Sequence, residues 1–192
     1  YRNLGGWKFE EITEQAGVAC EKQLSTGAMF GDVDGDGDLD LLVNSIGGGT
    51  RLFLNDGKGK FAENPGGRLV RRFGSSSMAL GDIDRDGDLD LYVANYLTII
   101  GKDQFPRTKV QARRQGGQVV VTPAGRYKTL PAPGGNVEVF EHGERDFLYI
   151  NNGQGQFAPV SWTNGNFLNE LGEPLTTTPQ EWSLSVMIRD IN

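Results

Sequence analysis

Cysteine and histidine each occur only once in the 192 residues of this sequence, as Cys20 and His142. A single cysteine excludes a disulfide within the chain, and we expect Cys20 to be a small buried hydrophobic side chain. A single histidine on a predicted loop excludes a histidine-based zinc motif and gives little basis for general acid-base catalysis. Nitrogen and sulphur ligands for metals are therefore scarce in this chain.

Long apolar runs and clustered basic residues are also missing. No apolar stretch approaches the ~20 residues that a membrane-spanning helix requires. The net charge is −6, and no clustered basic face of the kind that binds nucleic acid accompanies it. There is no nucleophile elbow, and the glycine run at 47–49 lacks the lysine and helix of a phosphate-binding loop. The sequence therefore predicts no membrane span, no nucleic-acid partner and no enzymatic activity.

Aspartate, in contrast, is concentrated in two short loops, which hold ten of the 25 acidic residues. Residues 31–43 have the sequence GDVDGDGDLDLLV, and residues 81–93, which lie 50 positions later, have the sequence GDIDRDGDLDLYV. Carboxylates packed this closely repel by about 1 kcal/mol per pair at 4 Å even in water. A cation must offset the repulsion, and ligands that are all oxygen select a hard ion such as calcium.

The spacing predicts which groups bind calcium. A calcium loop turns sharply at its sixth position, where Gly37 and Gly87 can adopt positive φ. We expect one backbone carbonyl ligand in each loop, from Asp38 and Asp88. The expected side-chain ligands are Asp32, Asp34, Asp36 and Asp40 in the first loop and Asp82, Asp84, Asp86 and Asp90 in the second. An EF-hand is excluded, because position twelve is valine instead of glutamate and the segments that follow are predicted strands.

A solvated acidic turn between strands is the alternative explanation for one such loop. Two copies with the same five aspartates and the same glycine favour metal binding, because turn chemistry alone would allow these residues to vary. A third copy begins at Met187 and is cut off by the end of the sequence after two ligand positions, Asp190 and Asn192. We therefore predict two Ca²⁺ sites and a truncated third, and we expect the chain to be part of a longer protein.

A second element also recurs, in which an asparagine, two glycines and an aromatic residue span seven positions, at 3–9, 55–61 and 151–157. This composition between strands indicates a hairpin, and we assign these residues no chemistry of their own. Each unit of about 50 residues then contains four predicted strands, as in a blade of a β-propeller. Both faces of the strand after the first acidic loop are apolar, with Leu39, Leu41 and Val43 on one face and Leu42 on the other, so we expect neighbours to cover both.

The predicted fold class is therefore all-β, a fragment of a β-propeller. Residues 1–18 are expected to end one blade, with a helical turn that stops at Gly17 after a short strand near Glu11. Residues 27–65 form a blade with calcium loop 32–40, residues 77–160 a blade with calcium loop 82–90, and residues 184–192 the start of another. An insertion at 98–144 interrupts the second of these blades. It is expected to lie outside the blade sheets, to contain a hairpin near Val119 with a turn at 122–125, and to contact a partner.

The segment from Phe30 to Asp40 resembles the FG-GAP/VCBS repeat, which is the calcium-bearing blade of integrin-α-type propellers and of many bacterial surface proteins. The hairpins and the insertion after Tyr96 further resemble proteins related to cartilage acidic protein, which combine such repeats with a C-terminal ASPIC/UnbV domain. The resemblance covers nearly all of the chain except the insertion. It implies a seven-bladed propeller in which calcium braces the loops, while the opposite face or the insertions bind partners. It implies no catalysis.

The leading function hypothesis is a calcium-binding repeat module for cell adhesion or other extracellular or cell-surface binding of a protein or carbohydrate, in which calcium is a structural staple. The expected location is extracellular, at the cell surface or periplasmic. The alternative is a non-catalytic or scaffold part of a propeller-based polysaccharide lyase or hydrolase. A calcium sensor is disfavoured, because no predicted helix pair flanks the loops.

Overall fold

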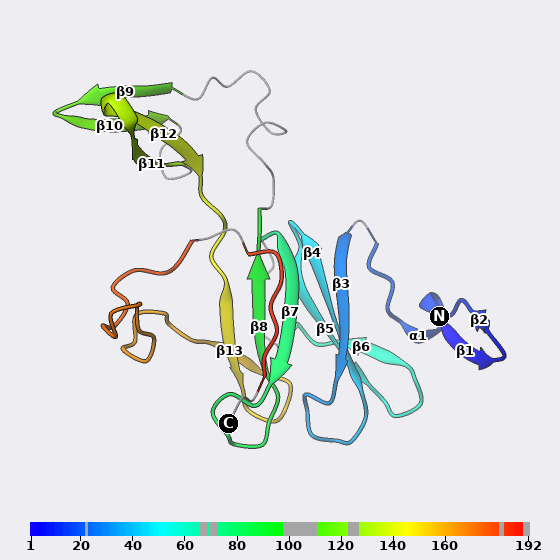
Figure 1. Ribbon diagram of the computed structural model, residues 1–192. Helices are drawn as coiled ribbons and strands as arrows, with labels where there is room; N and C mark the ends of the chain where they lie inside the picture. The colour runs from blue at the N-terminus through cyan, green and yellow to red at the C-terminus, as the bar shows by residue number, and fades with distance from the viewer. Residues whose placement is uncertain are drawn as a thin grey trace.

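The computed structural model describes residues 1–21, 23–65, 69, 73–97, 111–122, 127–180 and 183–189. In these residues two four-stranded antiparallel sheets lie side by side, and three two-stranded sheets accompany them (Figure 1). The only α-helix in the described part of the chain is α1 (Thr13–Ala16). No described helix has the length and hydrophobicity needed to cross a membrane. The predicted fold class, an all-β propeller fragment, is confirmed.

The first four-stranded sheet, called blade 1 here, follows the chain in the order β3-β4-β5-β6. Its strands are β3 (Leu24–Gly31), β4 (Asp40–Ile46), β5 (Gly49–Asn55) and β6 (Phe61–Glu63). The first acidic loop joins β3 to β4, and the turn at 56–60 joins β5 to β6. These are the four strands that the sequence predicts for a blade.

The second four-stranded sheet, blade 2, has the order β14-β13-β8-β7. Its strands are β7 (Ser75–Gly81), β8 (Asp90–Asn95), β13 (Phe147–Asn151) and β14 (Phe157–Pro159). The second acidic loop joins β7 to β8. The insertion separates β8 from β13, yet these strands still pair in the middle of the sheet, with Leu148 opposite Tyr92.

The described part of the insertion forms two hairpins, which pair within themselves and not with the blades. They consist of β9 (Gln111–Gln115) with β10 (Gln118–Thr122), and of β11 (Tyr127–Ala132) with β12 (Asn136–Glu141), the latter two joined by the 3₁₀ turn η2 (Pro133–Gly135). The hairpin near Val119 is confirmed, but its turn is at Gly116 and Gly117, whose φ values are 60° and 83°. A glycine pair adopts these left-handed conformations without steric cost. A turn was expected at 122–125. Thr122 is the last residue of β10, and residues 123–126 and 98–110 lie outside the described residues.

The N-terminal segment forms a separate hairpin of β1 (Arg2–Gly5) and β2 (Lys8–Glu10). The helical turn before Gly17 is confirmed, since α1 ends there with Gly17 in the left-handed conformation. The strand expected to begin at Glu11 is wrong: β2 ends at Glu10, and the side chain of Glu11 accepts the N–H of Thr13 at 2.8 Å. That contact turns the chain into α1 instead of extending it.

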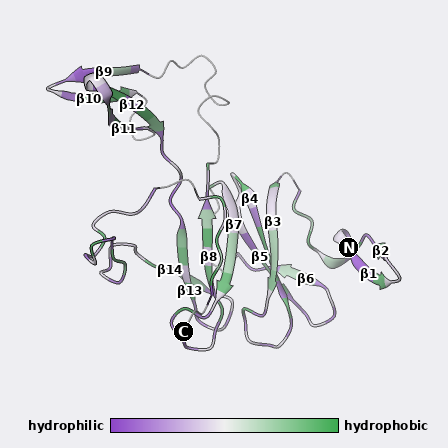
Figure 2. Ribbon diagram, viewed as in Figure 1, coloured by the Kyte–Doolittle hydropathy of each residue, from purple (hydrophilic) through white to green (hydrophobic). Residues whose placement is uncertain are grey.

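The main core lies between the two blades. Leu42 and Leu52 of blade 1 belong to one buried cluster with Leu91, Tyr149 and Phe157 of blade 2. Figure 2 shows the corresponding hydrophobic colour along β7, β8 and β13, in contrast to the hydrophilic β9 of the insertion.

The opposite face of blade 1 buries a smaller cluster of Leu41, Val43 and Phe53, against which Cys20 packs as a partly buried side chain. Both faces of β4 are therefore covered, as expected for a strand apolar on both sides. Leu39 is an exception. Its side chain is 57% exposed, because the strand begins only at Asp40.

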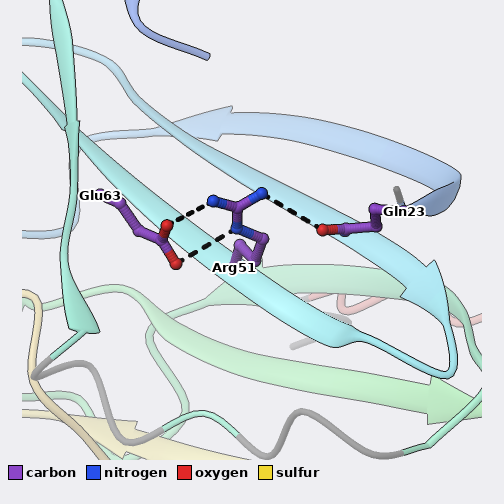
Figure 3. A network of polar contacts seen from close by, with 3 residues as sticks. All are labelled: Gln23, Arg51 and Glu63. Carbon is purple, nitrogen blue, oxygen red and sulfur yellow. Dashed lines mark hydrogen bonds and ion pairs between the residues drawn. The ribbon is translucent and has the colours of Figure 1, made fainter. Parts of the chain in front are cut away.

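Arg51, in β5, contacts both Glu63 in β6 and Gln23, which precedes β3 (Figure 3). Its Nε donates to Glu63 of β6 at 3.2 Å, its Nη2 makes an ion pair with the same carboxylate, and its Nη1 donates to Gln23 at 3.4 Å. The guanidinium also lies 4.9 Å from the centroid of the Phe53 ring. The Arg51 guanidinium thus joins β5 to β6 and is paired with a carboxylate.

Residues 183–189 run beside β7. Ser76 donates its hydroxyl to the carbonyl of Ser183 at 2.9 Å, and a Cβ on Gly81 would lie 2.8 Å from Cγ2 of Ile188. The same relationship joins the two blades, since a Cβ on Gly31 would lie 2.5 Å from Cδ1 of Leu80. Glycine at the end of β3 and of β7 therefore allows the next segment to approach closely. The assignment of 184–192 to a further blade stays a prediction.

Candidate metal centre

The first acidic loop is folded by its own carboxylates. The side chain of Asp32 accepts the N–H of Gly35 at 2.8 Å and that of Gly37 at 3.0 Å. Both glycines are left-handed, with φ of 77° and 92°, so the sharp turn predicted at Gly37 is present. Asp36 accepts the N–H of Asp38 at 2.9 Å. These local hydrogen bonds form a series of turns, which brings together carboxylates that are several positions apart in the sequence.

Three of the predicted ligands of this loop meet. Asp32, Asp34 and Asp40 each place a carboxylate oxygen within 4.8 Å of the others. Burial, followed by the charge of Asp40, raises the pKa of Asp34 above its ordinary value. Burial likewise raises the pKa of Asp40, although two backbone N–H donors act in the opposite direction. Each raised pKa means that the ionised carboxylate is disfavoured here without a counter-charge.

Asp40 also anchors the loop to the rest of blade 1. Its side chain is fully buried, and its two oxygens accept the N–H of Val33 at 3.1 Å and that of Asn55 at 2.9 Å. Asp90 has the same position in blade 2 and accepts the N–H of Ile83 at 2.8 Å and that of Asn151 at 3.0 Å. Each acidic loop is thus tied to the outer hairpin of its own blade through one carboxylate.

The second acidic loop has a similar local fold, but its turn bonds, its carboxylate group and the residue at position 85 differ from those of the first loop. Asp82 accepts the N–H groups of Asp86 and Gly87 at 3.1 and 3.2 Å. Asp82, Asp84 and Asp86 place carboxylate oxygens within 4.8 Å of one another. Desolvation, followed by the charge of Asp86, raises the pKa of Asp84. Arg85 stands where the first loop has Gly35 and adopts the same left-handed conformation, with φ of 67°.

The remaining predicted ligands lie outside these two groups of three. The carboxylate oxygens of Asp36 in the first loop and of Asp90 in the second do not belong to these groups. The carboxylates of Asp38 and Asp88 lie against Gly57 and Gly153 of the outer hairpins, where a Cβ would overlap them. Each of these side chains is therefore turned toward a hairpin, and the backbone carbonyl is the group left for the predicted role. The truncated third site, Asp190 and Asn192, lies outside the described residues.

Sequence reasoning missed the part played by two hairpin asparagines, to which it assigned no chemistry. Asn55 donates its side-chain N–H to the carbonyl of Leu39 at 3.1 Å and accepts the N–H of Gly59 at 3.1 Å. Asn151 donates to the carbonyl of Leu89 at 3.2 Å. The sequence did contain a signal for this role, because an asparagine ends the strand before both hairpins. A hairpin turn explains an asparagine equally well, so the contact with the acidic loop needed the structure.

The donor set suits a hard cation. All side chains gathered in the two groups are carboxylates, and Arg85 is the only basic residue in the two loops. Oxygen ligands of this kind suit calcium better than softer metals. Residues 32–40 and 82–90 therefore each hold a group of three carboxylates whose like charges a divalent cation would offset.

Comparison with protein-family models found a match to the family described as FG-GAP-like repeat, over residues 32–93. No curated protein matched the chain. The matched segment starts at the first aspartate of one acidic loop and ends in β8, just after the other. This part of the chain is similar to the FG-GAP-like repeat, and the match supports its assignment to the FG-GAP repeat proteins.

Proposed function

We propose that this chain is a calcium-binding β-propeller module in which one Ca²⁺ ion in each acidic loop acts as a structural staple. The observation that carries the proposal is that three carboxylates converge in each acidic loop: Asp32, Asp34 and Asp40 in the first, and Asp82, Asp84 and Asp86 in the second. The similarity to FG-GAP-like repeats supports it, since such repeats are typically non-catalytic structural modules.

Calcium fits these loops better than magnesium. Calcium accepts six to eight oxygen ligands in flexible geometry, whereas magnesium requires a near-ideal octahedron and retains several waters. In the proposed first site Asp32, Asp34, Asp36 and Asp40 supply carboxylate oxygens, and Asp38 supplies its backbone carbonyl. In the second site the same groups come from Asp82, Asp84, Asp86 and Asp90, with the carbonyl of Asp88. The bound ion would cancel the repulsion among these carboxylates.

The staple would act on the blade as a whole. Asp40 already holds the hairpin residue Asn55, so an ion that fixes the loop also fixes the connection between β4 and β5. Binding that favours the folded state adds RT ln(1 + [L]/Kd) to stability, which is about 2.7 kcal/mol per site when calcium is a hundredfold above Kd. Extracellular modules bind calcium with Kd of roughly 10⁻⁴ to 10⁻³ M, so an extracellular, cell-surface or periplasmic location belongs to the proposal.

The insertion is the proposed surface for a protein or carbohydrate partner. Its hairpins extend from the end of blade 2 opposite the acidic loops (Figure 1). All five residues of β9 are exposed, and this strand does not pair with the blades. A partner could therefore bind there without disturbing the calcium sites. Membership of the branch related to cartilage acidic protein, with its ASPIC/UnbV domain, is part of the same proposal.

Melting temperatures with millimolar calcium and with chelator test the calcium sites. Asp36→Ala and Asp86→Ala each remove one ligand and some repulsion, so each should lower the melting temperature in calcium and change it little in chelator. Wild-type protein should melt at a higher temperature with calcium than without. A wild-type melting temperature that does not respond to calcium would overturn the metal assignment, and equal losses in both conditions would show that these aspartates only form turns.

A further inference from the structure

Asn151 contacts both acidic loops. Its side-chain N–H group donates to the carbonyl of Val33 in the first loop at 2.7 Å and to the carbonyl of Leu89 in the second loop at 3.2 Å. Its backbone N–H donates to Asp90 at 3.0 Å. The residue is only 3% exposed, and its bonds to Val33 and Asp90 are buried away from competing water. One side chain therefore bridges two loops that belong to different blades.

Val33 is the residue of the first loop that accepts the hydrogen bond from Asn151. It lies between Asp32 and Asp34, two members of the carboxylate group, and its side chain is 1% exposed. Its N–H donates to Asp40, the third member, at 3.1 Å. Its carbonyl accepts two bonds from blade 2, from the side chain of Asn151 at 2.7 Å and from the N–H of Gly155 at 2.9 Å. The peptide groups of Val33 thus connect all three carboxylates to the neighbouring blade.

We propose that Asn151 couples the two calcium sites, so that an ion bound in either loop raises the affinity of the other. The proposal rests on the calcium binding proposed above. An ion in the first loop would fix the segment around Val33, and through its carbonyl the position of Asn151. Asn151 in turn holds Leu89 and Asp90, which border and supply the second site. The second ion would then order fewer free groups, and this gives positive cooperativity. Linkage requires the effect to be equal in both directions.

Asn55 provides a matched control within the same chain. It occupies the equivalent position at the end of β5 and makes the equivalent contacts to its own loop, through Asp40 and Leu39. The second loop lies on the other side of the blade interface, and no contact of the Asn55 side chain with it is observed in the described residues. Asn55→Ala should weaken the first site without removing the coupling, whereas Asn151→Ala should remove it.

Calcium titration calorimetry of the whole chain tests the coupling. Asp34→Ala disables the first loop and Asp84→Ala disables the second, and the affinity of the remaining site is compared with its value in the wild type. Each disabled loop should weaken the other site about 5-fold or more, the lower end of typical coupling. In the Asn151→Ala background the same comparison should give affinities that differ less than about 2-fold. In the Asn55→Ala background the full effect should persist.

Hydrogen exchange of the Gly155 amide gives a second readout that does not depend on Asn151→Ala folding. In the Asp84→Ala variant, calcium in the first loop should slow exchange of this amide, because the carbonyl it binds becomes fixed. Two loops that bind calcium independently in the wild type, with unchanged exchange at Gly155, would overturn the coupling and leave calcium binding intact. Absence of calcium binding at either loop would instead overturn the proposed function.

Discussion

The carboxylate of Asp40 accepts the backbone N–H of Asn55 at 2.9 Å, which joins the acidic loop of blade 1 to the outer hairpin of the same blade. Asp40 is fully buried, and its second oxygen accepts the N–H of Val33. This aspartate therefore differs from Asp36, which is exposed and holds only a neighbouring N–H of its own loop. Residues that are equivalent in the acidic pattern have different structural roles.

Asp40→Ala should destabilise the protein by about 2 to 4 kcal/mol even in chelator, because it leaves two backbone N–H groups without their acceptor. Urea unfolding in chelator measures this loss, and Asp36→Ala is the control, with an expected change below about 0.5 kcal/mol. If both variants lost the same stability in chelator, the anchoring role of Asp40 would be refuted.

Asp34→Asn should have opposite effects with and without calcium at pH 7. The pKa of Asp34 is raised in the folded protein above its ordinary value of 3.8. Ionised Asp34 therefore lowers the free energy of unfolding at pH values above the pKa of the folded protein. This destabilisation disappears as the pH falls through the folded pKa and then below 3.8, the ordinary value. In chelator the asparagine variant should be more stable than the wild type at pH 7, with the difference vanishing near pH 3.5.

In calcium at pH 7 the same variant should be less stable than the wild type, because it has lost a charged ligand. Chemical unfolding at both pH values, with and without calcium, gives the four free energies required. A variant that is less stable than the wild type in chelator as well would contradict the repulsion argument.

Arg85→Gly should stabilise the protein by about 0.5 to 1 kcal/mol. A left-handed conformation costs an L-residue roughly 1 to 2 kcal/mol. The gain from glycine is smaller than this, because glycine loses more conformational entropy on folding. Arg85 has φ of 67°, and the corresponding Gly35 has φ of 77°. Gly35→Ala is the reverse experiment. The Cβ of the new alanine would lie 3.5 Å from the carbonyl oxygen of Gly153, so there is room for the methyl group. Thermal unfolding should therefore show a gain for the first variant and a loss for the second.

Replacement of residues 98–143 by a short glycine-serine turn should leave the blades folded. The strands on either side already meet at the base of the insertion, where the N–H of Glu144 donates to the carbonyl of Tyr96 at 2.9 Å and the N–H of Asn95 donates to Asp146 at 2.7 Å. The shortened protein should keep its response to calcium and lose partner binding. Partner binding that survives the replacement unchanged would exclude the insertion as the binding surface.

The sequence by itself determined the strands of the two blades, the acidic loops and the all-β fold class. These features depend on local chemistry: aspartate and glycine at fixed spacing fold a loop through bonds between near neighbours, and apolar alternation marks the strands on either side. The repeat at 50 residues then indicated the blade, because one four-stranded sheet cannot bury both of its faces alone. The difference in length between the two units also predicted an insertion at 98–144.

The tertiary structure alone decided which aspartates meet, which are buried anchors, and that Asn151 bonds to both loops. Asp36 and Asp40 are equivalent in sequence as predicted side-chain ligands, but only Asp40 is buried against Asn55. The side chain of Asp38 is turned toward Gly57. The bond between Asn151 and Val33 joins residues 118 positions apart. It forms because the apolar faces of the two blades pack together, and no local pattern specifies that registration.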